Sequence, residues 1–179
     1  MKALYLYKHH HHLRSTRPKR QQAFFDRSNK VLTLAHQLFP KGKNCSTHNT
    51  NLQAHPVEAT AELVLAKFPV IYDAAFNSEG ISARFNILVH EHNQWTAYEV
   101  KSSLRINKNH LQDIALKYYV AKKSGVELED IFIIHINGDY TLKIGQVEAE
   151  KVFKITSIKT EVIDLHEGIE AAIHDAKEV

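Results

Sequence analysis

A carboxylate, an amide and an amine in one short stretch make the residues around Glu99 the strongest candidates for chemistry in this chain. Glu99 and Lys101 are separated by one apolar residue, Val100, and Asn86 stands 13 positions before Glu99. Successive side chains of a strand point to opposite faces, so Glu99 and Lys101 share a face if this stretch is a strand. They then form either part of a chemical site or an ordinary ion pair on an exposed strand end.

Two alternating segments joined by a polar turn are expected to bring Asn86 to Glu99. A hairpin symmetric about His92 and Asn93, with a loop of two or four residues, places Asn86 opposite Glu99 and Arg84 opposite Lys101. Directly opposed residues have Cβ atoms about 5 Å apart, so Asn86, Glu99 and Lys101 form one polar cluster. A slip of one residue in the register would separate them.

The same alternation predicts the faces of both strands. In the first strand, one face holds Ala83, Phe85, Ile87 and Val89, and the other holds Arg84, Asn86, Leu88 and His90. In the second strand, Trp95, Ala97, Glu99 and Lys101 lie on one face, opposite Tyr98 and Val100.

Composition limits the class of protein. The 179 residues suit one domain, or one domain with a ragged extension, and the hydrophobic content of 44% is enough for a core. The net charge of +3 permits nucleic-acid binding, and 13 histidines make the charge rise below about pH 6.5. The single cysteine, Cys45, excludes an internal disulfide, a cysteine-rich metal site and an iron–sulfur cluster within this chain. We see neither a signal peptide nor a membrane span, so we expect a cytoplasmic protein.

The periodicity of apolar residues predicts the elements that must position the cluster. Helices are expected over 24–39, 58–67, 110–124 and 160–178, with Gly125 as a C-terminal cap. Strands are expected over 69–76, 81–90, 95–101, 131–136 and 140–144, and residues 41–56 are expected to form a loop. Strands that follow one another and are then crossed by a helix predict an α/β fold, a mixed central sheet flanked by helices.

The N-terminal part differs in composition from the rest. We divide the chain into a basic, histidine-rich segment at 1–22, a domain at 23–160 and a C-terminal helix at 161–179, which is either the end of the fold or the start of a truncated region. The run from His9 to His12 is either a solvated surface segment, a metal-binding tract or the remnant of a tag. The basic run from Arg14 to Arg20 either contacts phosphates or is simply exposed.

Four stretches in this order resemble the PD-(D/E)XK nuclease superfamily: residues 72–76, 83–88, 98–103 and 110–120. The resemblance is to an uncharacterised bacterial branch related to the CRISPR-associated exonucleases and the RecB nuclease domain, and it covers roughly residues 2–160. It implies a nuclease-like domain at 23–160 with a restriction-endonuclease-like core, and metal-dependent hydrolysis of DNA. In that family two acidic residues hold Mg²⁺ or Mn²⁺, and a lysine orients the attacking water.

Carried onto this chain, the resemblance makes Glu99 a metal ligand and Lys101 the catalytic lysine, with Asn86 where the family has its metal-binding aspartate. Asp73, at a position often held by glutamate, either substitutes for the missing acid or is a polar residue at a strand end. Lys117 stands where the branch usually has a glutamine. Asn86 removes a negative charge and Lys117 adds a positive one, and both changes act against binding a divalent cation.

Two hypotheses therefore remain open: a Mg²⁺-dependent nuclease with a weakened site, or a catalytically inactive nuclease fold that binds nucleic acid or a protein. A missing C-terminal region that supplies the function is a third possibility. Contacts to DNA are expected from Lys117, Arg84, Lys108 and Tyr118. The alternative is that the lysines form a solvated helix face and that Tyr118 packs in the core beside Leu111 and Ile114.

Overall fold

A six-stranded mixed sheet forms the centre of the computed structural model, which describes residues 19–46, 55–141 and 147–177. The strand order is β1–β2–β3–β4–β5–β6, with β1 parallel to β2, β4 parallel to β5, and the other neighbours antiparallel. The strands are β1 (Lys43–Asn44), β2 (Val70–Ser78), β3 (Ile81–Glu91), β4 (Gln94–Lys101), β5 (Leu128–Ile136) and β6 (Phe153–Ser157).

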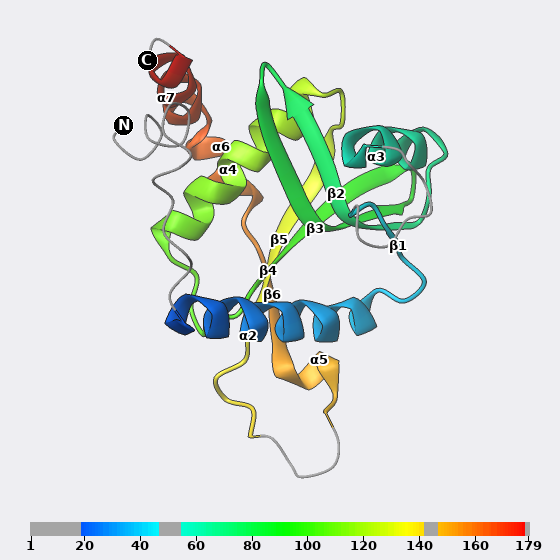
Figure 1. Cartoon of the computed structure of the whole chain (residues 1–179), viewed down its shortest axis with the longest axis vertical. Coiled ribbons are helices and arrows are strands. Elements are labelled where there is room, and N and C mark those ends of the chain that lie inside the picture. The colour runs from blue at the N-terminus through cyan, green and yellow to red at the C-terminus, as the bar shows by residue number, and fades with distance from the viewer. Residues whose placement is uncertain (1–18, 47–54, 142–146, 178–179) are drawn as a thin grey trace.

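Helices cover both faces of this sheet (Figure 1). They are α2 (Lys19–Ala35), the 3₁₀ turn η2 (His36–Leu38), α3 (Pro56–Leu65), α4 (Lys108–Lys123), α5 (Ala149–Val152), α6 (Lys159–Asp164) and α7 (His166–Lys177). One core joins α3, α4, α6 and α7 to the sheet, and a second core joins α2 and α5 to the other face. The predicted α/β fold with a mixed sheet between helices is confirmed.

Most elements lie where the sequence predicts them. The helix expected at 110–124 is α4, and Gly125 ends it with a positive φ of 86°. The Gly125 N–H binds the Lys122 carbonyl and the Val126 N–H binds that of Ala121, the pair of bonds that closes a Schellman motif. No helix in the described part of the chain is long and apolar enough to cross a membrane.

Two strands were not predicted. β1 is only two residues long, within the segment expected to be a loop. β6 buries Phe153 alone and exposes the other four residues, so it carries no alternating pattern. Of the edge strand expected at 140–144, Tyr140 and Thr141 lie outside any strand, and the remainder falls outside the described residues. The run from His9 to His12 and most of the basic run also fall outside them.

The prediction for the faces of β3 is wrong, because the alternation breaks at Asn86. Phe85 packs in the core on the α4 side, whereas Ile87 packs in the core on the α2 side. β2 changes face at the matching place: Tyr72 pairs with Ile87 and Ala74 with Phe85, and the residue between them, Asp73, has a positive φ of 54°. A left-handed residue within a strand turns the following side chains, which explains the change. The faces predicted for β4 are confirmed.

Gly42 packs directly on the aromatic ring of Tyr72, and the Gly42 N–H donates to the Tyr72 hydroxyl at 3.3 Å. A Cβ at position 42 would overlap the ring. Because the ring is held between this loop and His36, with which it stacks at 3.9 Å, it has little freedom to move. We expect Gly42→Ala to lower the free energy of unfolding by about 1–3 kcal/mol, measured by denaturant titration. Gly80→Ala is not a suitable control because φ is positive there, but Gly168→Ala on α7 meets nothing within 4 Å.

Candidate functional site

Two carboxylates and two ammonium groups form a closed cluster between β4 and α4, made of Glu99, Lys101, Asp113 and Lys117 and called here the ion-pair cluster. Glu99 Oε1 accepts from Lys101 Nζ at 2.9 Å and from Lys117 Nζ at 2.6 Å. The same two ammonium groups reach Asp113 Oδ2, at 2.8 and 3.3 Å. The four formal charges cancel, so the cluster is neutral as it stands.

The packing of α4 on the sheet brings these four side chains together. Glu99 and Lys101 point to the α4 face of the sheet with Ala97, which is fully buried. α4 packs on that face through Ile114, Ala115 and Tyr118. Asp113 and Lys117 are four residues apart on this helix, so they lie one above the other.

Burial differs sharply between the two acids. The Glu99 side chain is 5% exposed, whereas that of Asp113 is 44% exposed. The Lys101 and Lys117 side chains are 19% and 16% exposed. A buried charge without a partner is strongly unfavourable, so Glu99 depends on both lysines, while Asp113 joins them from the solvent side.

The charges of the cluster stabilise one another. Burial alone lowers the pKa of the Lys101 ammonium, but the charge of Glu99 and the hydrogen bonds to Asp113 and Glu99 outweigh it, so this pKa is raised. Burial alone raises the pKa of the Asp113 carboxyl, but Lys101 and Lys117 outweigh it, so this pKa is lowered. The stability from Asp113 is therefore lost as pH falls through its lowered pKa, and that from Lys101 as pH rises through its raised pKa.

Asn86 holds the backbone at the point where β3 and β4 separate. The ladder follows the predicted register from Glu91 and Gln94 to Ile87 and Tyr98, and then stops. One residue further on, Asn86 Oδ1 accepts the Val100 N–H at 2.8 Å in place of a backbone carbonyl. Continuing the register by one residue places Asn86 opposite Glu99, as predicted. However, Asn86 Oδ1, the oxygen expected to act as a metal ligand, accepts a hydrogen bond from the backbone.

A divalent cation fits this donor set poorly. Two ammonium groups already bind Glu99, and adding a doubly charged ion would leave a strong positive excess around a nearly buried carboxylate. Within the described residues, no group of three or more His, Cys, Asp or Glu side chains is placed to hold a metal ion. One observation points the other way: Glu99 Oε2 is buried and has no hydrogen-bond partner in the described part of the chain.

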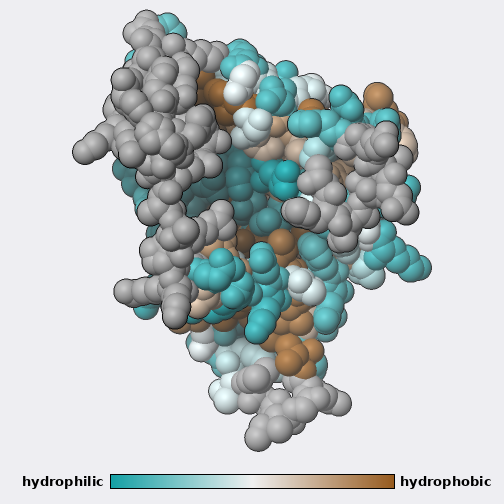
Figure 2. Space-filling model, viewed as in Figure 1, coloured by the Kyte–Doolittle hydropathy of each residue, from teal (hydrophilic) through white to brown (hydrophobic). Residues whose placement is uncertain are grey.

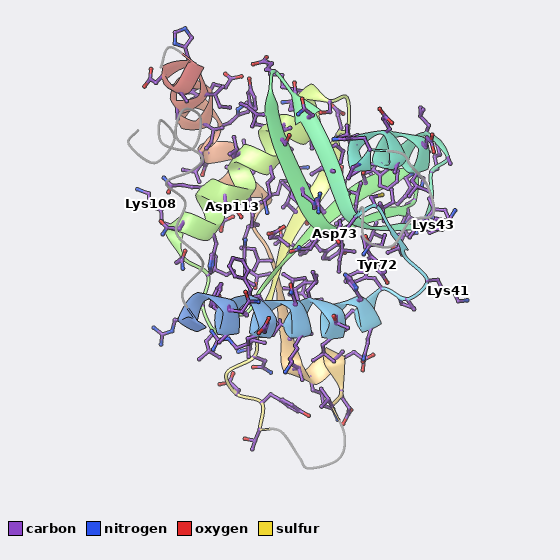
Figure 3. All side chains as sticks on the ribbon, in the orientation of Figure 1. Lys41, Lys43, Tyr72, Asp73, Lys108 and Asp113 are labelled. Carbon is purple, nitrogen blue, oxygen red and sulfur yellow. The ribbon has the colours of Figure 1, made fainter. Side chains whose placement is uncertain are left out.

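The other predicted site residues lie apart from the ion-pair cluster. Asp73 is on β2 beside Tyr72, at some distance from Asp113 on α4 (Figure 3). Arg84 does not pair with Lys101, because the ladder ends first; it lines a separate cavity with His55 and Ser82.

The remaining two candidates for DNA contacts are both on α4. Lys108 is the first residue of α4 and is exposed; Figure 3 labels it at the N-terminal end of this helix. Tyr118 is 9% exposed and belongs to the core, with the Lys122 ammonium 6.0 Å from its ring centroid.

Asp113 was not predicted as a site residue, although a signal for it is present. An acid four residues before a lysine on a helix indicates an ion pair, and Lys117 was already a candidate. What the sequence does not show is that this face of α4 lies over Glu99 rather than over solvent.

His110 closes the N-terminus of α4 in a capping box with Asn107. The Asn107 side chain accepts the His110 N–H at 3.0 Å, and His110 Nδ1 accepts the Asn107 N–H at 3.4 Å. Burial, and then the positive charge of Lys101, lower the pKa of His110, while Asp113 and Glu99 oppose this. A protonated ring cannot accept a hydrogen bond at Nδ1, so the cap depends on the neutral form.

We therefore expect His110 to make stability fall with acidity. Its folded pKa lies below its unfolded value, so its contribution is complete above about pH 6.5 and is lost as pH falls toward the folded pKa. The free energy of unfolding at pH 7.5 minus that at pH 5.5 should be smaller in His110→Gln than in the wild type. An equal difference in both proteins would contradict the assignment, and His55→Gln serves as the control, because His55 is exposed at the start of α3 and its side chain makes no capping hydrogen bond.

Comparison with known proteins adds little to this geometry. No protein-family model matches the chain, and no curated protein matches it. One solved structure, described as the crystal structure of SSO0001, is 12% identical, covering 96% of this chain and 85% of its own, with a TM-score of 0.31. A TM-score this low carries no argument about fold or function.

Proposed function

We propose that this chain is a nuclease-like domain of the PD-(D/E)XK type that binds nucleic acid, DNA foremost, in the cytoplasm without hydrolysing it. One observation carries the proposal: the carboxylate at the position of the family's metal ligand, Glu99, accepts hydrogen bonds from two lysines, at 2.9 and 2.6 Å. Two ammonium groups compete directly with a cation for the same oxygen. Asn86 adds to this, since its oxygen is bound to the Val100 N–H.

The proposal is tested by measuring binding and cleavage on the same samples. Labelled single- and double-stranded DNA is incubated with the wild type and with Glu99→Ala, with excess Mg²⁺, with Mn²⁺, and with a chelator. We expect DNA binding that does not depend on metal, and intact DNA in every sample. Metal-dependent cleavage by the wild type that disappears in Glu99→Ala would overturn the proposal, as would a lack of DNA binding.

A second candidate function, a Mg²⁺-dependent deoxyribonuclease, is favoured by the unpartnered Glu99 Oε2. Buried polar atoms nearly always have a partner, so an oxygen without one is a candidate ligand atom. If Mg²⁺ binds there, Glu99 holds it and supplies negative charge, while Lys101 is close enough to interact with a phosphate. The cleavage assay above decides between the two candidates, because only this one predicts metal-dependent products.

A further inference from the structure

A cavity of about 400 Å³ opens beside the ion-pair cluster, between α2, the end of β4 and the start of α4. Its size falls in the range of small-ligand sites, about 300–1,000 Å³. Figure 1 shows α2 crossing one end of the sheet close to the link between β4 and α4, and Figure 2 shows hydrophilic residues around the hollow above α2. A hydrogen bond of 3.2 Å between the Ser28 and Ser102 hydroxyls joins the two walls.

The α2 wall presents a cation, an aromatic ring and a hydroxyl on one helix face. Phe24, Arg27 and Ser28 are spaced at i, i+3 and i+4, and all three line the cavity. Phe24 is 53% exposed, and its ring makes an edge-to-face contact with Phe25 at 6.2 Å between centroids. The Arg27 guanidinium carbon lies 5.7 Å from the Phe24 ring centroid, and Arg27 has no ion pair with any described residue.

The opposite wall adds hydroxyl donors and little free negative charge. Ser102 and Lys101 line it, together with His110 from α4. The acids nearest to this wall, Glu99 and Asp113, are both paired with lysines in the ion-pair cluster. Among the described residues, the charge that faces the cavity without an ion-pair partner is therefore the positive charge of Arg27.

We propose that this cavity binds one unpaired nucleotide of a nucleic-acid strand. The phosphate lies on the Arg27 guanidinium and the hydroxyls of Ser28 and Ser102, which suit its oxygens in charge and in hydrogen bonding. The base stacks on the exposed ring of Phe24, which only an unpaired base can do. The inference rests on the proposed function, and adds to it the place where the strand binds and the state of the bound nucleotide.

The test measures the affinity of a fluorescent single-stranded oligonucleotide, and of the blunt duplex of the same sequence, across a series of salt concentrations. Arg27→Gln should bind the single strand about tenfold more weakly, as expected for loss of a charged hydrogen bond. Its slope of log affinity against log salt should fall by about 0.7, the value for one phosphate contact on a single strand. Phe24→Ala should also bind about tenfold more weakly, but with the wild-type salt slope.

Two variants outside the cavity serve as matched controls. Lys30→Gln removes an exposed charge from α2 outside the cavity, and Ile163→Ala removes an exposed apolar side chain on α6. Both should stay within about twofold of the wild type, and thermal melting checks that every variant folds. The blunt duplex should bind the wild type at least about tenfold more weakly than the single strand.

The outcomes separate the two proposals. If the wild type binds neither oligonucleotide, the proposed function and this inference both fail. If the wild type binds, but Arg27→Gln and Phe24→Ala behave like their controls, or the duplex binds as tightly as the single strand, this inference fails and the proposed function stands. Loss of affinity in both variants, with the salt slope changed only in Arg27→Gln, supports it.

Discussion

The double variant Asn86→Asp/Lys117→Gln is expected to bind Mn²⁺ and Mg²⁺ at least about a hundredfold more tightly than the wild type. It removes an ammonium group that lies 2.6 Å from Glu99 Oε1 and adds a carboxylate on the neighbouring strand. Unit charges about 4 Å apart interact by about 4 kcal/mol at the effective dielectric of a protein surface, so two such changes greatly exceed the 1.4 kcal/mol that a tenfold change requires. An aspartate can still accept the Val100 N–H.

Calorimetric titration of the wild type, the two single variants and the double variant measures this effect. Lys122→Gln is the matched control, because it removes an exposed lysine from the same helix outside the ion-pair cluster. Wild-type affinity equal to that of the double variant would show that the lysines do not compete with metal. In that case the deoxyribonuclease becomes the better interpretation of the site.

Glu99→Gln is expected to lower the free energy of unfolding by about 3 kcal/mol, the largest effect on stability that we predict for the site. The substitution keeps the size of the side chain but leaves the Lys101 and Lys117 ammonium groups, whose side chains are 19% and 16% exposed, with Asp113 as their remaining acid. Denaturant titration at neutral pH measures the loss. Glu62→Gln, an exposed acid on α3, should change it by less than about 0.5 kcal/mol.

A double-mutant cycle identifies the cause. Lys117→Gln in the Glu99→Gln background should restore part of the lost stability, because it removes one of the two cations that are left to share the single charge of Asp113. If Glu99→Gln lowered the free energy of unfolding by less than about 1 kcal/mol, the ion pairs of Glu99 with the two lysines would contribute no more than ordinary surface ion pairs. The role of the cluster as the buried link between β4 and α4 would then be wrong.

The ion-pair cluster joins four charged side chains without a metal ion. Glu99 accepts hydrogen bonds from Lys101 and Lys117, and both lysines also contact Asp113, so each formal charge of the cluster faces an opposite one. The cavity on the α2 side of Lys101 presents hydroxyl groups, an exposed aromatic ring and a cation that has no ion pair with any described residue. Under the proposed function, a cluster that does not bind metal and a cavity that binds a nucleic-acid strand lie side by side.

Local sequence patterns are enough to predict most of the elements and the neighbours of Glu99 along β4. Period-two alternation and a short polar turn fixed the register of β3 and β4, and period 3.6 with a glycine cap fixed α4. These signals are local, since side-chain direction follows directly from position along a strand or helix. Glu99 and Lys101 share a face for this reason alone.

The partners of those side chains depend on how the elements pack, which local patterns do not show. Asp113 reaches the lysines because α4 packs across β4, and Asn86 binds Val100 because β3 and β4 separate at that point. The change of face in β2 depends on the positive φ of Asp73, a backbone angle that no period reveals, and β3 changes face at Asn86, opposite Asp73. Short strands such as β1 and β6 take their hydrogen bonds from distant partners, so their own residues carry too little pattern to predict them.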